Sequence, residues 1–292
     1  MNLNRRGFLK AAGIISIGAS NVYVKSDNDK HESNNVTLSK IRVTQIKVYP
    51  EKGKMDVNHR KLMDIIDKIE KNEEVDVVVT PEGFLDGYVS TEKSVSKEDM
   101  INYAIDPLTS PYAITVSRWA RRNKVWLIYG CTRKADDGIF NTALIYNRDG
   151  RLIGMYDKLH LQNHDLKYTP GKHLNVYESD FGLFGVMICA DRRWPETART
   201  LTLKGARVIF NPTYGMHGDL NLCMMRTRAY ENGIYIIFTH PGQSLITNYK
   251  GAVVCNNTDE KKTYTVTEID LSKAPANKGG HIVDRRTDVY EL

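Results

Sequence analysis

Residues 184–196 (FGVMICADRRWPE) constrain the fold more strongly than any other stretch of the chain. The stretch opens with an apolar run, residues 184–188, that reads as a buried strand and stops abruptly at Cys189. Charged residues follow at once, and Pro195 then suits the first turn of a helix. A cysteine at such a strand-to-helix turn stands at the end of a sheet, beside backbone N–H groups that can hold an anion. This is the position of a nucleophile.

Strand and helix patterns alternate along much of the chain, which predicts a layered α/β fold. Residues 147–150 (NRDG) are a strong hairpin-turn signal between two of the predicted strands. We expect strands at residues 40–48, 75–80, 125–129, 141–146, 152–156, 184–188, 208–211 and 234–239, with further strand pairing of 244–254 with 263–269. We expect helices at residues 56–70, 112–122, 196–203 and 221–231, and a looser helix at 96–108.

Composition bounds the class of protein. The chain has 292 residues, of which 41% are hydrophobic and 26% are charged, and no internal linker rich in Pro, Gly or Ser divides it. We therefore expect one globular domain. The formal charge of +6 falls to +3 when Arg5, Arg6 and Lys10 at the amino end are left out. Because the sequence has no clustered basic stripe with interleaved aromatic residues, we expect no nucleic-acid partner.

The four cysteines, Cys131, Cys189, Cys223 and Cys255, have no C-x-x-C spacing. They form neither a zinc-binding pattern nor a dense disulfide framework, and we expect neither a metal nor a cofactor. We interpret the three cysteines other than Cys189 as small core or surface residues.

The amino-terminal segment resembles a twin-arginine export signal. Arg5 and Arg6 are followed by Phe-Leu-Lys and a modest apolar stretch, residues 11–19, with no acidic residue among or before them. The apolar stretch is too short to span a bilayer as a helix, so we expect no stable membrane span. A chance Arg-Arg pair in a disordered tail is the alternative. We favour export of a folded protein to a periplasmic or other extracytoplasmic location, with residues 1–39 as signal and linker and residues 40–292 as the functional domain.

Three predicted strands end in residues that can do chemistry together. Glu82 follows residues 75–80, Lys158 follows the second arm of the hairpin, and Cys189 follows residues 184–188. A free thiol has a pKa of about 8.5, so only a minority is thiolate at neutral pH. A carboxylate can take the thiol proton, and an ammonium group can lower the thiol pKa and hold an oxyanion. The set suits attack on an amide-like carbon, through a thioester that water hydrolyses.

From about residue 40 to its end, the sequence resembles the nitrilase-like carbon–nitrogen hydrolases. The motifs are residues 80–82 (TPE), 156–161 (YDKLHL) and 188–191 (ICAD), with supporting matches at 228–232 (RAYEN), 244–251 and 285–290 (RRTDVY). One such motif would be weak, whereas three in this order are specific. The resemblance implies an α-β-β-α sandwich that usually pairs with a second copy across a helical face. It also implies that Glu82 is the base, Lys158 the oxyanion stabiliser and Cys189 the nucleophile.

Within that family, residues 189–197 (CADRRWPET) are most similar to the N-carbamoyl-D-amino-acid hydrolases. In those enzymes the arginines after the cysteine bind the substrate carboxylate, a task that suits the planar guanidinium fork. The hypothesis is that Arg192 or Arg193 binds an acidic group of the substrate. The alternative is that one of them makes a structural ion pair with Asp191 or Glu196.

The sequence departs from the family pattern in the loop after the lysine. Family members usually carry a second glutamate there, but no Glu lies between Lys158 and Glu178. The short loop at residues 162–168 offers His164 and Asp165 instead, and either could replace the missing carboxylate. The departure bears on substrate class more than on reaction type.

The function that we predict is hydrolysis of a small-molecule amide or N-carbamoyl substrate that carries a carboxylate. A nitrile substrate is less favoured. Two alternatives stay open, an acyltransferase that passes the thioester to an amine and an inactive binding protein on the same fold.

Residues 214–219 (YGMHGD) either line the pocket or form a flexible loop. His160 either orients a neighbour or packs as a structural residue.

Overall fold

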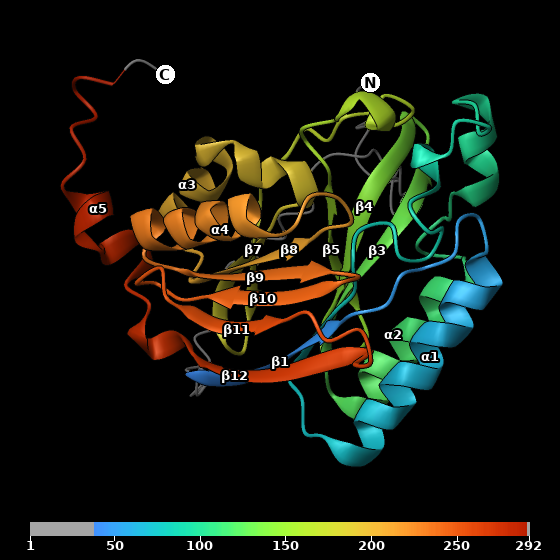
Figure 1. The fold of residues 1–292 in the computed structure, drawn as a ribbon, viewed down its shortest axis with the longest axis horizontal. Coiled ribbons are helices and arrows are strands. Elements are labelled where there is room, and N and C mark those ends of the chain that lie inside the picture. Colours follow the sequence, from blue (N-terminus) through green and yellow to red (C-terminus); the bar gives the residue numbers. More distant parts are fainter. Residues whose placement is uncertain (1–37, 291–292) are drawn as a thin grey trace, which may run out of the picture. The chain divides into compact units, whose positions relative to one another are not determined.

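The computed structural model describes residues 38–290, and within them twelve strands form two six-stranded sheets (Figure 1). The first sheet has the order β12-β1-β2-β3-β4-β5, and the second has the order β11-β10-β9-β8-β7-β6. The strands of the first sheet are β1 (Lys40–Ile46), β2 (Val77–Val79), β3 (Trp126–Ala135), β4 (Gly138–Tyr146), β5 (Leu152–Asp157) and β12 (Tyr264–Asp270). The strands of the second sheet are β6 (Val176–Ser179), β7 (Gly182–Val186), β8 (Val208–Pro212), β9 (Tyr235–His240), β10 (Gln243–Thr247) and β11 (Val253–Asn257).

Helices cover the outer face of each sheet, which confirms the predicted α-β-β-α sandwich in a single domain. The α-helices are α1 (Met55–Asn72), α2 (Pro111–Asn123), α3 (Pro195–Leu203), α4 (Asp219–Asn232) and the short α5 (Gly280–Val283). The 3-10 turns are η1 (Val89–Thr91), η2 (Glu98–Tyr103), η3 (Asn163–Asp165), η4 (Cys189–Arg193), η5 (Leu271–Lys273) and η6 (Ala276–Lys278). In Figure 1, α1 and α2 lie on one flank of the sheets, and α3 and α4 lie on the other.

Three buried apolar clusters follow from this layering. Val77, Ile128, Phe184 and Phe210 belong to the cluster between the two sheets. A second cluster joins α1 and α2 to the first sheet, and a third joins α3 and α4 to the second sheet. The central strands of each sheet are thus buried on both faces, which explains why they are continuous apolar runs rather than alternating patterns.

Several sequence signals for helices and turns are confirmed, although the looser helix expected at residues 96–108 is only the 3-10 turn η2. The α1 residues that recur at helical spacing, Leu62, Ile65, Ile66 and Ile69, are all buried against the first sheet. Directly after Asn232, the helix α4 is ended by Gly233, whose φ of 63° is the left-handed conformation that glycine adopts without strain. The expected hairpin between β4 and β5 is formed and antiparallel.

One predicted pairing is wrong, and other strands differ in length. β12 does not pair with the segment at residues 244–254 but crosses to the first sheet, where it runs antiparallel to β1 from Tyr264 opposite Ile46 to Asp270 opposite Lys40. Alternation alone cannot distinguish these sites, because either sheet offers a free edge strand. β6 was not predicted, and β2 contains only three residues.

The strand directions explain where chemistry can occur. β1, β2 and β3 are parallel neighbours, as are β7, β8 and β9. β5 is antiparallel to β4, which is antiparallel to β3, so β5 runs in the direction of β3. The carboxyl ends of such strands meet at one edge of a sheet, which is where ligands bind in α/β proteins. Glu82, Lys158 and Cys189 all follow strands of these two sets.

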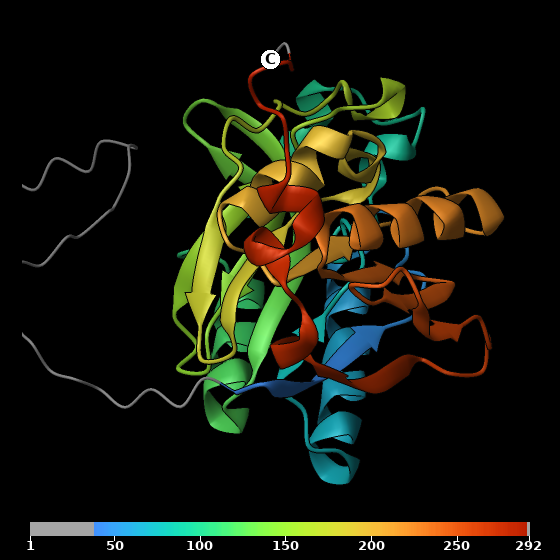
Figure 2. The ribbon, with the colours of Figure 1, turned by 90° about the vertical axis from the view of Figure 1, so that its left-hand side faces the viewer.

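The C-terminal segment runs outside the layer of α3 and α4 (Figure 2). It is held there in part by Arg199 of α3, whose guanidinium donates to the carbonyl of His281 at 3.3 Å. The twin-arginine segment predicted at the amino end lies outside the described residues, so export remains a prediction. No helix between residues 38 and 290 is both long and apolar enough to cross a membrane.

Candidate active site

Glu82 lies in the turn that follows β2 and is fully buried. Its Oε1 accepts hydrogen bonds from the Nζ of Lys158 and the Nδ2 of Asn141, both at 2.8 Å. Its Oε2 accepts from the backbone N–H of Tyr214 at 3.0 Å. The turn needs Gly83, because φ is 54° there and a Cβ would stand 2.9 Å from the Cα of Tyr88. The carboxylate is therefore held rigidly by groups from three separate segments.

Lys158 is the centre of a buried charge cluster. Its Nζ donates to Glu82 at 2.8 Å, to Asp165 at 2.6 Å and to the hydroxyl of Tyr88 at 3.2 Å. The three ammonium protons thus have three acceptors. Burial alone would lower the pKa of Lys158, but the nearby acidic groups Glu82, Cys189 and Asp165 raise it above its ordinary value. The side chain is therefore a fully buried, permanent cation.

Asp165 is one of the two loop residues, with His164, that could replace the glutamate missing from the family pattern. It is fully buried, and its carboxylate accepts from Lys158 at 2.6 Å and from the hydroxyl of Tyr88 at 2.5 Å. His164 is half exposed and contacts the same hydroxyl through Nε2 at 3.0 Å. Burial raises the pKa of Tyr88 well above its usual range, so its phenol is a neutral donor. Of the two loop residues, Asp165 is the one in contact with the lysine.

Cys189 stands at the start of the turn η4 with a φ of 46°. This left-handed conformation is unusual for a residue that is not glycine, and it costs roughly 1–2 kcal/mol. The thiol is nearly buried, at 7% exposure. Burial and Glu82 raise the pKa of Cys189, whereas Lys158, Arg192 and the backbone N–H of Gly215 oppose that rise. The thiol therefore keeps its proton at neutral pH unless a base removes it.

The two arginines after the cysteine have different environments. Arg192 is buried, with Nη1 3.6 Å from the sulfur of Cys189, Nε 2.6 Å from Oδ1 of Asn221 and Nη2 2.6 Å from the carbonyl of Met216. Arg193 is exposed and donates to Oε1 of Gln162 at 2.6 Å. Among the described residues, neither arginine is ion-paired with the acidic residues of its own turn and helix. Arg192 alone faces the sulfur.

Glu231, in the matched motif at residues 228–232, supports this turn indirectly. Its carboxylate pairs with Arg228 at 3.0 Å along α4. The guanidinium of Arg228 in turn donates to the carbonyls of Arg192 and Arg193, each at 3.2 Å. The helix ion pair and the support of the turn are therefore the same arrangement.

The segment at residues 214–217 lines the site rather than forming a free loop. Besides the Tyr214 contact to Glu82 and the Met216 contact to Arg192, Tyr214 accepts at its carbonyl from His240 Nε2 at 2.8 Å. Burial and the neighbouring His217 lower the pKa of His240 to about 4, so this ring is neutral. A cavity of about 540 Å³ lies beside this segment, lined in part by Tyr49 and His217.

Sequence reasoning did not single out three residues of the site: Tyr88 and Asn141 were not among its candidates, and Tyr214 was included only within residues 214–219, as pocket lining or flexible loop. Each acts through a contact between segments that are remote along the chain. Gly87-Tyr88 after the glutamate motif and the glycine in Tyr214-Gly215 mark tight turns, but neither indicates which residue the turn approaches.

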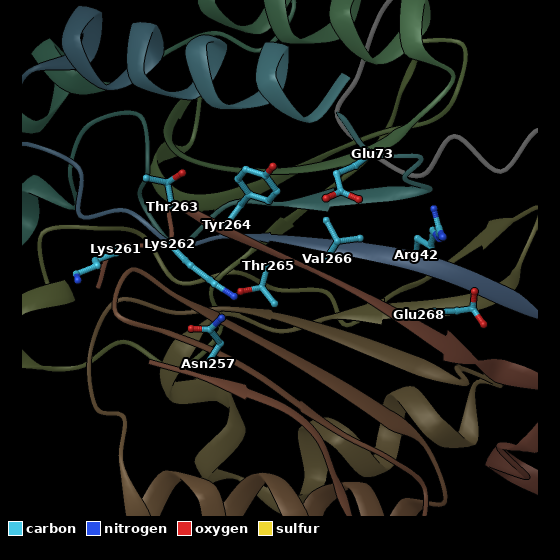
Figure 3. A pocket seen from close by; sticks show the side chains of 10 residues that line it. All are labelled: Arg42, Glu73, Asn257, Lys261, Lys262, Thr263, Tyr264, Thr265, Val266 and Glu268. Atoms are coloured by element: carbon cyan, nitrogen blue, oxygen red, sulfur yellow. The ribbon is translucent and has the colours of Figure 1, made fainter. Parts of the chain in front are cut away.

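A larger groove, of about 610 Å³, contains none of these residues (Figure 3). It is lined by β12 and its neighbours, with the mixed charges of Arg42, Glu73, Lys261, Lys262 and Glu268. No cysteine or other nucleophile with a base beside it lines the groove. Across residues 38–290 there is also no group of three or more His, Cys, Asp or Glu side chains placed to hold a metal ion.

Comparison with known proteins agrees with this geometry. Residues 40–277 match the family described as Carbon-nitrogen hydrolase, and the chain belongs to that family. The predicted class of enzyme, a hydrolase of C–N bonds other than peptide bonds, is thereby confirmed.

Several curated relatives are similar over most of their length. The omega-amidase NIT3 of Saccharomyces cerevisiae is 29% identical over 234 residues, which cover 73% of this chain and 78% of that protein. A nitrilase of Pyrococcus abyssi is 29% identical over 86% of this chain and 99% of its own length. The N-carbamoylputrescine amidase of Solanum tuberosum is 26% identical over 67% of this chain and 77% of its own.

Solved structures confirm the fold. The crystal structure of Saccharomyces cerevisiae Nit3, a member of branch 10 of the nitrilase superfamily, superposes with a TM-score of 0.74. The match covers 87% of this chain and 98% of that chain, at 22% identity. A carbon–nitrogen hydrolase from Helicobacter pylori gives the same TM-score at 21% identity.

Proposed function

We propose that the chain hydrolyses an amide or N-carbamoyl C–N bond through a thioester on Cys189, with Glu82 as general base and Lys158 as oxyanion stabiliser. The observation that carries the proposal is the convergence of these groups. Lys158 Nζ bonds Glu82 at 2.8 Å, and the charges of both act on the pKa of the Cys189 thiol. Because burial raises that pKa, attack requires a base beside the sulfur, and Glu82 is the candidate.

The steps follow from these positions. As the sulfur attacks the carbonyl carbon, Glu82 takes the thiol proton and the carbonyl oxygen becomes an oxyanion beside the ammonium of Lys158. When the C–N bond breaks, protonated Glu82 gives its proton to the leaving nitrogen. Water then attacks the thioester, Glu82 takes a proton from it, and the C–S bond breaks. The thiolate regains a proton from Glu82, so proton balance is restored.

We assign to Asp165 the role of the second carboxylate, which sequence left open between it and His164. Its contact with Lys158 at 2.6 Å supports this assignment, and so does the exposure of His164. With two carboxylates on one ammonium, the cation cannot turn away from the place where the oxyanion forms. His164, at the edge of this cluster, would then contact the substrate or order Tyr88.

We propose a substrate that bears a carboxylate. The support is Arg192, which holds a guanidinium 3.6 Å from the sulfur in a buried position, where its charge is screened much less than at the surface. Two of its nitrogens are tied to Asn221 and Met216, so the fork is fixed before a ligand arrives. Arg193, exposed at the rim, would bind only the outer part of a substrate.

The test is a panel of N-carbamoyl amino acids, acid amides, simple amides and a nitrile, assayed for release of ammonia. Cys189→Ala is the matched control, and turnover that persists in it would contradict the proposal. An electrophilic amide probe with mass spectrometry of the Cys189 peptide separates an active thiol from an inactive binding protein. Product that forms only when an amine acceptor is added would instead identify an acyltransferase.

We also propose that two or more copies associate through the helices α3 and α4. The support is the large apolar side chains exposed there, Leu203 at 39%, Leu220 at 67% and Tyr230 at 52%. Light scattering on the protein and on Leu220→Glu would test this, because a charge on the face should yield monomers.

Export is a separate proposal that rests on Arg5 and Arg6, and fractionation of cells that express the double Lys variant would test it.

A further inference from the structure

The carboxylate of Asp191 makes four hydrogen bonds in the interior, although it takes no part in the proposed reaction. Oδ2 accepts from the backbone N–H of Ile188 at 2.9 Å and from the hydroxyl of Tyr156 at 2.7 Å. Oδ1 accepts from the backbone N–H of His160 at 2.9 Å and lies 2.7 Å from Nδ1 of the same residue. Asp191 is fully buried, and a carboxylate is retained in such a place only when its acceptor sites are filled.

One of these four bonds, together with a backbone hydrogen bond of Asp191, closes the turn that carries the nucleophile. The backbone N–H of Asp191 donates to the carbonyl of Ile188 at 3.0 Å, while its side chain accepts from the N–H of Ile188. Cys189 lies between them with a φ of 46°. A residue keeps such a conformation only when its surroundings impose it. The contacts of Asp191 on both sides of Ile188 supply that constraint.

The other contacts reach the segment that carries the lysine. Tyr156 and His160 stand two residues before and two residues after Lys158. Both side chains hydrogen-bond to the carboxylate of Asp191, Tyr156 at Oδ2 and His160 at Oδ1. The ring of His160 is held in turn by Trp194, which stacks on it with ring centres 4.0 Å apart. One side chain on the cysteine turn therefore binds the lysine segment at both of its ends.

This connection matters because the two segments belong to different sheets. β5 is the last strand of the first sheet and β7 lies in the second, so no backbone ladder fixes Lys158 relative to Cys189. Between packed sheets only side chains set the register. We propose that Asp191 is a positioning residue that sets the distance between the ammonium of Lys158 and the sulfur of Cys189. This inference rests on the proposed function of those two residues.

Asp191→Asn is the direct test, because it keeps the shape and cannot accept at both positions. A displacement of about 1 Å in a catalytic group can cost roughly a hundredfold in rate, so we expect kcat to fall by about that factor. KM should change less than threefold, since Asp191 does not face the substrate. Asp157→Asn is the matched control, because Asp157 lies beside Lys158 but pairs with Arg133 at 2.7 Å instead. Its kcat should stay within about threefold of the parent.

A second measurement does not depend on turnover. The rate at which iodoacetamide alkylates Cys189 follows its thiolate fraction, and Lys158 is one of the groups that lower the thiol pKa. We expect the alkylation profile of Asp191→Asn to move to higher pH, and that of Asp157→Asn to match the parent. If no substrate of the panel is hydrolysed but the alkylation profile of Asp191→Asn shifts as expected, the proposed reaction is rejected and the role of Asp191 is retained.

Tyr156→Phe is a milder substitution that keeps the inference testable if Asp191→Asn does not fold. It removes one of the four hydrogen bonds and leaves the ring in the core. We expect a smaller loss, of about tenfold in kcat, in the same direction as Asp191→Asn. The inference is overturned if both Asp191→Asn and Tyr156→Phe keep parental kcat and alkylation profiles. It is also overturned if Asp157→Asn loses as much as they do.

Discussion

The Oδ2 atom of Asp165 lies 2.6 Å from the Nζ of Lys158, and both side chains are fully buried. The turn η3 places Asp165 there, and the backbone N–H of Gln162 donates to the same oxygen at 3.1 Å. Asp165, on a tight turn, thus reaches the same ammonium group that Glu82, from the turn after β2, contacts at 2.8 Å. The lysine is shared by two carboxylates, and removal of either one changes how firmly it binds the other.

We predict that Asp165→Asn reduces kcat/KM by about a hundredfold or more. Breaking a buried ion pair on one side leaves Lys158 bound to Glu82 alone, so the base is drawn toward the ammonium and away from the thiol. The measurement is steady-state ammonia release with the best substrate of the panel. Circular dichroism and melting temperature of the variant establish that the loss is not one of folding.

His164→Gln is the comparison that resolves the alternative. The imidazole is half exposed and touches only the Tyr88 hydroxyl and, at 3.9 Å, Asp165. We expect less than a tenfold loss in kcat/KM. A large loss in His164→Gln together with near-parental activity in Asp165→Asn would transfer the carboxylate's role to the histidine.

A separate prediction concerns the resting state of the thiol. Burial and Glu82 raise the pKa of Cys189, so its alkylation by iodoacetamide should have a midpoint above the pKa of about 8.5 for a free thiol. Peptide mass spectrometry in a Cys223→Ser background measures it, because Cys223 is exposed. Glu82→Gln should move the midpoint to lower pH by removing a negative neighbour. A midpoint near pH 6 in the parent would contradict the general-base step.

The parts of the site that sequence could predict share one physical cause. Glu82 and Lys158 follow β2 and β5 of the first sheet, and Cys189 follows β7 of the second, so topology places each of them at a carboxyl end of its own sheet. Tyr88, Asn141 and Tyr214 were not predictable in this way. Their contacts join segments that are remote along the chain: for Tyr88 and Asn141 these belong to or follow strands of the first sheet, and for Tyr214 they come from both sheets.

The path of β12 has a similar explanation. Its alternating residues fit any half-buried edge, and only the length of the connection after β11 and the free edge of β1 decide which sheet it joins. The choice of Asp165 over His164 likewise depends on the turn η3, which points one side chain inward and its neighbour outward. Sequence supplied both candidates, but the backbone turn separated them.

The arginine pair gives a prediction about substrate binding. Arg192→Lys keeps the charge but cannot reach Asn221 and Met216 as a fork, so we expect KM for carboxylate-bearing substrates to rise at least about tenfold. KM for neutral amides should change less. Arg193→Ala, which loses only its exposed contact with Gln162, should leave KM within about threefold.

The same two arginine variants can also contradict the proposal that Arg192 binds the substrate carboxylate. A large KM effect in Arg193→Ala would place the carboxylate at the rim and leave Arg192 as a stabiliser of the thiolate. Equal KM values for acidic and neutral substrates in both variants would remove the carboxylate from the proposed substrate class.

The last prediction concerns stability and pH. Asp86 is fully buried, and burial raises its pKa from 3.8 to about 6, although the N–H groups of Val89 and Thr132 oppose the rise. A folded pKa above the unfolded one means that the stabilising contribution is fully present below about pH 4. It is lost as pH rises through 6, which amounts to about 3 kcal/mol at pH 7. Asp86→Asn removes this titration.

Because Asn can accept only one of the two N–H groups, the absolute stability of Asp86→Asn does not isolate the titration. The informative quantity is the difference in unfolding free energy between variant and parent, measured by urea denaturation at pH 4.5 and 7. We expect it to shift in favour of the variant by about 2 kcal/mol between these two pH values. Asp137→Asn, at an exposed site, controls for the loss of any carboxylate. A difference that does not vary with pH would mean that Asp86 is ionised in the folded protein throughout this range.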